Sequence, residues 1–272
     1  MEDMMRLIAG ALLSCLAFAS VAQESPLRAL QTGDDTRGWE AVGRINMGER
    51  GFCTGAMIAV DLVLTAAHCL FDKETGARVA AGDIEFLAGW RNGRAIAYRG
   101  VRHAVAHPDY VYAGMDTLER VAFDIAVLQL DQPIRLPSVR PFAVDARPQT
   151  GDEVRVVSYA QDRAEAPSLE EVCLVLGREP GVLVLSCSVD FGSSGAPIFV
   201  VRDGVAKVVS VVSAKAEVKG QDVALGTSLV EPMVALRAEL AAEAGQSSSS
   251  RPRVLMLSGG GGGGAKFVKP AP

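Results

Sequence analysis

The sequence predicts an all-β protein, either a sandwich or a pair of barrels, with one helix near the end of the chain. Short β-branched or apolar runs recur along it, and clusters of Gly, Pro, Asn and Asp separate many of them. Only one late stretch has apolar residues spaced by three and four, as in a helix. Of the 272 residues, 49% are hydrophobic, so the chain can bury one large core or two small ones.

Turn residues separate the predicted strands and a helix follows them. Arg91-Asn92-Gly93 and Arg202-Asp203-Gly204 are typical of tight hairpin turns, because Asn, Asp and Gly tolerate positive φ. The helix is predicted to begin at Pro232 and to end at Gly245. The predicted strands cover residues 55–63, 84–87, 125–130, 154–158, 182–187, 197–201 and 205–213.

The first 22 residues are typical of a secretory signal peptide. Arg6 precedes an apolar run, 7–18, and the small residues Ser20-Val21-Ala22 suit a signal peptidase. An uncleaved anchor is an alternative, and lipidation is another because Leu12-Leu13-Ser14-Cys15 loosely resembles a lipobox. The expected location is secreted or periplasmic, and the mature form is expected to have no membrane span.

Composition predicts four segments. Serines and six consecutive glycines near the end of the chain offer too little apolar area to fold. The predicted segments are a signal peptide at 1–22, a short N-terminal extension or pro-segment at 23–37, a folded domain at 38–245 and a flexible Ser/Gly-rich tail at 246–272.

Charge and cysteine content exclude several classes of function. The formal net charge is −5, from 27 Lys and Arg against 32 Asp and Glu, so binding to nucleic acid is not expected. Three His, five Cys and no C-x-x-C spacing predict neither a metal site nor a cofactor. Four cysteines remain once the signal peptide is removed, and in an exported chain they predict two disulfides with three possible pairings.

Three motifs carry residues of one catalytic chemistry. His68 lies in Thr65-Ala66-Ala67-His68-Cys69, Asp124 heads an apolar strand, and Ser194 lies in Gly192-Ser193-Ser194-Gly195-Ala196-Pro197. A serine hydroxyl needs a base to take its proton, and that base needs an acceptor that fixes its tautomer. The small residues around Ser194 allow a carbonyl to approach, with the N–H groups of Gly192 and Ser194 facing the developing oxyanion.

In this order the motifs resemble the trypsin-like serine proteases of the chymotrypsin family, of a bacterial, secreted type. The resemblance covers roughly residues 38–242. It implies two six-stranded antiparallel β-barrels with a C-terminal helix and a catalytic cleft between the barrels. It also implies that His68 is the general base, Asp124 its orienting partner and Ser194 the nucleophile.

The resemblance further implies the disulfide Cys53–Cys69 beside the catalytic histidine, and with it Cys173–Cys187. The expected function is a monomeric serine endopeptidase that cleaves protein or peptide substrates through an acyl-enzyme. The alternative is a catalytically silent binding module of the same fold.

One departure from the family concerns activation. Members activated from zymogens have Asp directly before the nucleophile, paired with a new Ile-Val-Gly-Gly amino terminus. Here that position is Ser193, and no Ile-Val-Gly-Gly sequence is present. We therefore expect other contacts to hold the oxyanion loop.

A second departure concerns specificity. Six residues before the nucleophile, where trypsins have Asp, this chain has Ser188, so cleavage after Lys or Arg is not expected; Asp190 nearby leaves it as an alternative. The pocket wall is assigned to Ser213, Ala214 and Lys215, with Ser210 as a competing register. Lys215 would favour an acidic substrate residue, whereas Ser188 with a neutral wall would favour an apolar one. Glutamyl endopeptidases are similar around residues 193–197, but their pocket histidine is not evident here.

Overall fold

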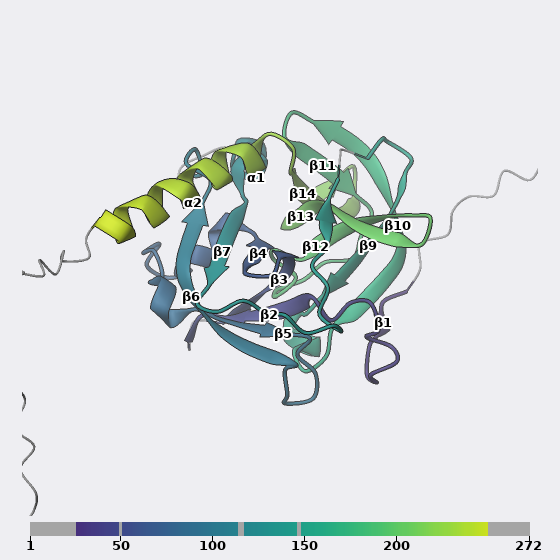
Figure 1. The fold of residues 1–272 in the computed structure, drawn as a ribbon. Helices are drawn as coiled ribbons and strands as arrows, with labels where there is room; N and C mark the ends of the chain where they lie inside the picture. The colour runs from purple at the N-terminus through teal and green to yellow at the C-terminus, as the bar shows by residue number, and fades with distance from the viewer. Residues whose placement is uncertain (1–25, 49–50, 114–116, 146–147, 250–272) are drawn as a thin grey trace, which may run out of the picture.

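The structure, a computed structural model, describes residues 26–48, 51–113, 117–145 and 148–249. The described chain forms two closed barrels of six antiparallel strands, followed by a C-terminal helix (Figure 1). The prediction of an all-β pair of barrels with a C-terminal helix is confirmed. The predicted signal peptide at 1–22 and the glycine run of the predicted tail lie outside the described residues.

The first barrel brings two distant segments of the chain together. Thr65, the last residue of β4, pairs with Ala126, the first residue of β7. This register places the turn after β4, which carries His68, beside the segment before β7, which carries Asp124. The barrel closes in the order β2 (Val42–Asn46), β3 (Phe52–Ala59), β4 (Leu62–Thr65), β7 (Ala126–Leu130), β6 (Ala97–Ala106) and β5 (Glu85–Ala88).

The second barrel carries the Ser194 segment in the connection between β11 and β12. Its order is β9 (Glu153–Ser158), β10 (Ser168–Glu179), β11 (Val182–Leu185), β14 (Gln221–Ser228), β13 (Val205–Val218) and β12 (Pro197–Arg202), and β12 pairs with β9 to close it. Two short strands lie at its edge, β1 (Arg28–Ala29) on β10 and β8 (Ala143–Val144) on β13. The short helices are η2 (Ala67–Leu70), η3 (Ala81–Asp83), α1 (Thr117–Phe123) and η4 (Gln161–Arg163).

Two of the predicted turns have the expected backbone. Asn92 and Asp203 have φ of 50° and 53°, and each is followed by a glycine of positive φ. The predicted strand at 55–63 is wrong in one respect, because a turn at Val60 and Asp61 divides it between β3 and β4. Apolar residues on both sides of a two-residue turn had hidden the hairpin.

Aromatic rings join the two barrels. Trp39, before β2, lies 5.0 Å from Phe199 of β12, and Phe142, between the barrels, lies 4.7 Å from Phe199, measured between ring centroids. Phe199 is fully buried, and the core cluster to which it belongs includes residues of both barrels. Burial of such rings stabilises the barrels relative to each other.

The N-terminal segment packs against the second barrel. Leu30 is fully buried and its N–H donates to Pro167 O over 2.8 Å, while Arg28 forms an ion pair of 3.0 Å with Glu171. Arg91 donates to the hydroxyl of Thr36. The folded unit therefore includes residues from the predicted extension at 23–37.

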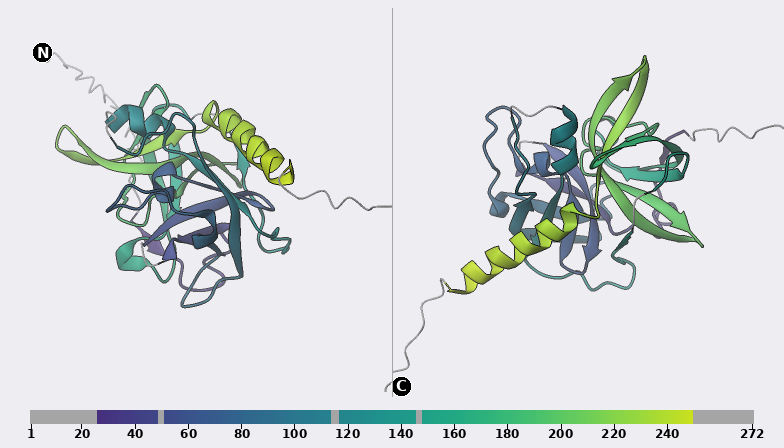
Figure 2. Two further views of the ribbon diagram at one scale, coloured as in Figure 1. Left: turned by 90° about the vertical axis from the view of Figure 1, so that its left-hand side faces the viewer. Right: turned by 90° about the horizontal axis from the view of Figure 1, so that it is seen from above.

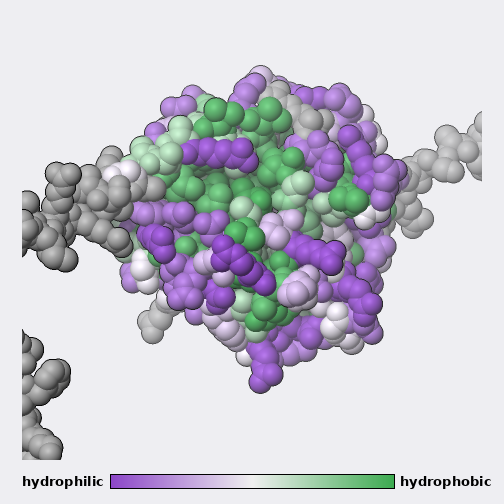
Figure 3. Space-filling view, viewed as in Figure 1, coloured by the Kyte–Doolittle hydropathy of each residue, from purple (hydrophilic) through white to green (hydrophobic). Residues whose placement is uncertain are grey.

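Helix α2 (Pro232–Ser249) lies along β6 and β7 of the first barrel (Figure 2). Its start agrees with the prediction, but it continues past Gly245, because a single glycine costs only about 1 kcal/mol in a helix. His103 of β6 and Glu243 form a contact of 3.3 Å between Nδ1 and Oε2. Apolar side chains gather in the upper middle of the face in Figure 3, beside the start of α2. Among the described residues, no helix has the length and apolarity needed to cross a membrane.

Candidate active site

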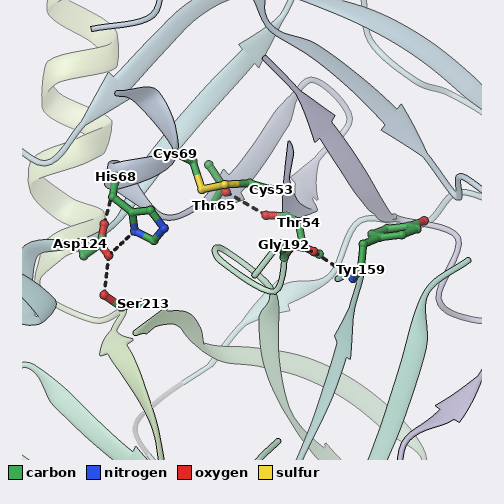
Figure 4. The surroundings of a disulfide bond; sticks show 9 residues. All are labelled: Cys53, Thr54, Thr65, His68, Cys69, Asp124, Tyr159, Gly192 and Ser213. Carbon is green, nitrogen blue, oxygen red and sulfur yellow. Dashed lines mark hydrogen bonds and ion pairs between the residues drawn. A yellow bond between two sulfur atoms is a disulfide. The ribbon is translucent and has the colours of Figure 1, made fainter. Parts of the chain in front are cut away.

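His68 and Asp124 form a closely bonded polar pair at the junction of the barrels. The Nδ1 of His68 lies 2.6 Å from Oδ2 of Asp124, and the backbone N–H of His68 donates to Oδ1 over 2.8 Å (Figure 4). The hydroxyl of Ser213 donates to the same Oδ2. Asp124 is only 3% exposed, so these donors replace the water that a carboxylate would otherwise bind.

The surroundings of Asp124 keep a neighbouring phenol neutral. Burial raises the pKa of Tyr110, and the negative charge of Asp124 raises it further. Tyr110 therefore contributes packing beside the carboxylate and no charge.

The disulfide Cys53–Cys69 fixes the turn that carries His68. It joins β3 to η2 with 6.2 Å between the Cα atoms, directly beside His68 (Figure 4). The second disulfide, Cys173–Cys187, joins β10 to the segment that leads to Ser194, with 5.1 Å between the Cα atoms. Both bridges that the resemblance implied are thus present in the structure.

Metal-ligating side chains come together at only two places in the described part of the chain. One group is Cys53, His68 and Cys69, and the other is Glu170, Cys173 and Cys187. The sulfur atoms of both groups are committed to disulfides, so neither group offers a thiolate to a metal.

The segment around Ser194 packs against the end of β4. Gly195 has a φ of +74°, and a Cβ atom there would lie 2.1 Å from Oγ1 of Thr65 and 2.5 Å from the carbonyl oxygen of Thr54. The N–H of Thr54 donates to Ser194 O over 2.9 Å. Glycine at this position lets the second barrel bring Ser194 against the strand that leads to His68.

The hydroxyl of Thr54 links the loop to both barrels. Thr54, on β3, is fully buried; its hydroxyl donates to Gly192 O over 2.8 Å and accepts from the N–H of Tyr159 over 3.0 Å (Figure 4). This bond holds the carbonyl of Gly192 toward the interior. Within the described chain, no backbone carbonyl accepts a hydrogen bond from the N–H of Gly192 or of Ser194.

Ser194 shares a cavity with a residue that bonds Asp124. A cavity of about 230 Å³ is lined by Ser194 together with Ser213, whose hydroxyl bonds Asp124. Among the hydrogen bonds of the described residues, none joins the hydroxyl of Ser194 to His68. A contact between a base and a nucleophile commonly shortens when substrate binds.

The candidate pocket residues divide between two adjoining cavities. Ser213, Ala214 and Lys215 line the cavity beside Ser194, as expected. Ser188, expected at the pocket base, is exposed and lines a neighbouring cavity of about 210 Å³. Its N–H donates to Oε2 of Glu170 over 2.8 Å, which draws this segment toward β10.

Sequence reasoning missed three contributors to this site. Thr54 and Arg163 approach the Ser194 loop from distant parts of the chain, and no local pattern marks them. Ser213 was assigned to the pocket wall, but it is also the third donor to Asp124.

Comparisons with known proteins agree with this architecture. Residues 53–211 match the family model described as "Trypsin-like peptidase domain". A "Vitellin-degrading protease" of Bombyx mori is 26% identical over 175 residues, which are 61% of this chain and 56% of the relative. The chain thus spans little more than half the length of that relative.

A solved structure titled "Structure of Glu endopeptidase in complex with MPD" superposes with a TM-score of 0.65 at 17% identity, covering 81% of this chain and 98% of the other. At that identity the likeness concerns the fold, and it identifies the paired barrels as chymotrypsin-like. Together with the family match over more than half of the sequence, it leads to one conclusion: this chain belongs to the trypsin-like peptidase domain family.

Proposed function

We propose that this protein is a serine endopeptidase that hydrolyses peptide bonds through an acyl-enzyme formed on Ser194. The observation that carries the proposal is the 2.6 Å contact between His68 and Asp124, whose third donor, Ser213, lines the same cavity as Ser194. Family membership supports peptidase activity.

Each residue has a defined step in this mechanism. With its Nδ1–H donated to Asp124, His68 presents Nε2 as the base that takes the proton of Ser194. The Ser194 oxygen then attacks the substrate carbonyl carbon, and the N–H groups of Gly192 and Ser194 donate to the oxyanion. When the intermediate collapses, the C–N bond breaks and His68 gives its proton to the leaving amine. Water, activated by the same base, hydrolyses the ester.

The lining of the cavity beside Ser194 favours an apolar substrate residue. Val189, Val212 and Ala214 line it, and Lys215, the one cation in its lining, has its Nζ 3.2 Å from a carboxylate oxygen of Asp222. We therefore favour the apolar alternative over the acidic one. A panel of chromogenic peptides that differ only at the residue before the cut should give a kcat/KM at least tenfold higher for Val or Leu than for Glu. A preference for Glu would refute the assignment.

The remaining proposals follow from the same features. Two disulfides favour an oxidising compartment, secreted or periplasmic, and the glycine- and alanine-rich composition favours a bacterial source. In this proposal the protein acts as a monomer on protein or peptide substrates, and its chemistry needs no cofactor.

Labelling by a fluorophosphonate tests the proposed function against a silent binding module. The purified protein should react at Ser194, and Ser194→Ala should not react, while Ser138→Ala, which changes an exposed serine elsewhere, should react like wild type. Absence of labelling and of peptide turnover in the folded wild-type protein would favour the binding module.

A further inference from the structure

The residue immediately before Ser194 is a fully buried serine with several polar neighbours. The Ser193 hydroxyl lies 3.3 Å from the carbonyl oxygen of Tyr159 and 3.4 Å from the hydroxyl of Ser158, and the N–H of Asp190 lies 3.4 Å from it. The oxyanion loop is therefore anchored on its buried side through a neutral hydroxyl.

Arg163 supplies the charge at this anchor. Its side chain is 15% exposed, and Nη1 donates to the carbonyl oxygen of Ser158 over 2.7 Å and to the Ser158 hydroxyl over 3.1 Å. Its Nη2 donates to the hydroxyl of Ser193 over 3.3 Å. One guanidinium thus bonds both β9 and the residue before the candidate nucleophile, as its fork of donors allows.

Nearby carboxylates help to keep this buried cation charged. Burial lowers the pKa of Arg163, while the negative charges of Asp162, Asp190 and Glu170 act in the opposite direction. The Nε of Arg163 lies 3.8 Å from Oδ1 of Asp162. The guanidinium therefore stays a cation beneath the loop.

The segment that carries Arg163 is itself held by the first barrel. The carbonyl oxygen of Ala164 accepts from Trp90 Nε1 over 3.1 Å and from Arg44 Nη1 over 3.4 Å. The N–H of Gln161, the first residue of η4, donates to the carbonyl oxygen of Phe191 over 2.8 Å. The backbone segment that carries Arg163 is therefore held in place, and its guanidinium contacts the oxyanion loop.

We propose that Arg163 is a positioning residue that, through Ser193 and Ser158, holds the Gly192–Ser194 loop in the conformation that stabilises the oxyanion. In family members activated from zymogens, an ion pair with a new amino terminus acts at the position of Ser193. Here the internal guanidinium takes that role, so the site is assembled without a cut that creates such a terminus. This inference rests on the proposed endopeptidase function.

Substitution at Arg163 separates positioning from other roles. Arg163→Ala should lower kcat about tenfold to a hundredfold with KM changed less than threefold, because a misplaced oxyanion loop weakens the transition state more than substrate binding. Arg163→Lys should recover part of this loss. The matched control is Arg178→Ala, an exposed arginine of the same barrel whose Nη1 bonds Gln149, and it should leave kcat unchanged.

The kinetics of the Arg163 and Ser193 variants decide whether the inference holds. An unchanged kcat in folded Arg163→Ala would overturn the inference, as would an effect confined to the KM of acidic peptides, which would make Arg163 a substrate-binding residue. If Arg163→Ala does not fold, Ser193→Ala and Arg163→Lys decide: a fall in kcat of threefold or more in both supports the proposal, and any other result overturns it.

A second arm tests independence from the amino terminus. The protein beginning at Gln23 with an acetylated terminus should turn over peptide and label with fluorophosphonate as fast as the same protein with a free amine. A requirement for the free amine would overturn the role of Arg163 and leave the endopeptidase function intact. Absence of turnover in both forms would instead contradict the proposed function itself.

Discussion

The two barrels contribute to the candidate site by different means. On the first barrel, side chains hold one another, because Asp124 bonds the imidazole and the backbone N–H of His68 and a disulfide lies beside that histidine. On the second barrel, the backbone positions Ser194, through the positive φ of Gly195 and the bond from the Thr54 N–H. We infer that polar side chains position His68, the proposed base, and that loop conformation positions Ser194, the proposed nucleophile. Substitutions in the two barrels should therefore affect activity in different ways.

Loss of the contact between Asp124 and His68 should lower kcat more than any other change. Asp124→Asn should lower kcat about ten-thousandfold, because an amide does not hold His68 in the tautomer whose Nε2 is a base. Steady-state kinetics on an apolar peptide would measure this loss. Asp131→Asn, a change at an exposed aspartate, should retain full activity. A loss below tenfold for Asp124→Asn would remove Asp124 from the mechanism.

A steric clash in the Ser194 loop should also lower activity. Gly195→Ala should lower kcat about a hundredfold or more and destabilise the fold by about 1–3 kcal/mol, since the new Cβ meets Thr65 and Thr54. The control is Gly93→Ala, where φ is +81° but nothing lies within 4 Å of the added atom. It should lose stability and keep kcat, and comparable losses of kcat in both variants would contradict the role of close packing.

Removal of either disulfide should lower the free energy of unfolding by a similar amount but affect the kinetics differently. The bridges have sequence separations of 16 and 14, so each should contribute about 3 kcal/mol to the free energy of unfolding. Replacing Cys53 and Cys69 by Ala frees the turn of His68 and should lower kcat, whereas replacing Cys173 and Cys187 should mainly raise KM. Urea unfolding and kinetics at low temperature would test this, and the reverse assignment of kcat and KM would refute it.

The smallest expected effect concerns His107, a buried histidine outside the site. Burial lowers its pKa from the ordinary value of 6.5, with Asp109 acting against the shift, and its Nδ1 accepts from the N–H of Asp109. The unfolded chain therefore binds a proton more readily than the folded one, so stability should fall as the pH drops below about 6.5. His107→Asn should flatten the dependence of Tm on pH in this range; an equally steep dependence would exclude His107 as its source.

Local chemistry explains which parts of the fold were predictable. The turns at Asn92-Gly93 and Asp203-Gly204 follow from residues that accept positive φ, and the start of α2 follows from the spacing of its apolar residues. Strands β10 and β14 were missed because polar residues interrupt or flank their apolar residues: Glu170 and Glu171 in β10, and Gln221, Asp222, Thr227 and Ser228 in β14. What holds them is pairing with partners that a local pattern does not reveal.

The same distinction applies to the site. His68, Asp124 and Ser194 lie in motifs whose residue types already state a chemistry. Arg163 has no such motif, because its significance comes from a contact with Ser193, 30 residues away. The position of Ser188 was also beyond a residue count, since a hydrogen bond to Glu170 in another strand sets it.

The docking of β1 constrains the order in which the molecule can assemble. Arg28 and Glu171 are 143 residues apart along the chain, and within the described residues β1 pairs with β10 alone. Since closing so long a loop is slow until the partner strand is in place, the N-terminal segment should dock late in folding. A ribosome-bound chain that has completed the first barrel would still lack Pro167 and β10, so Leu30 and β1 would not yet have the hydrogen-bond partners that they have in the folded protein.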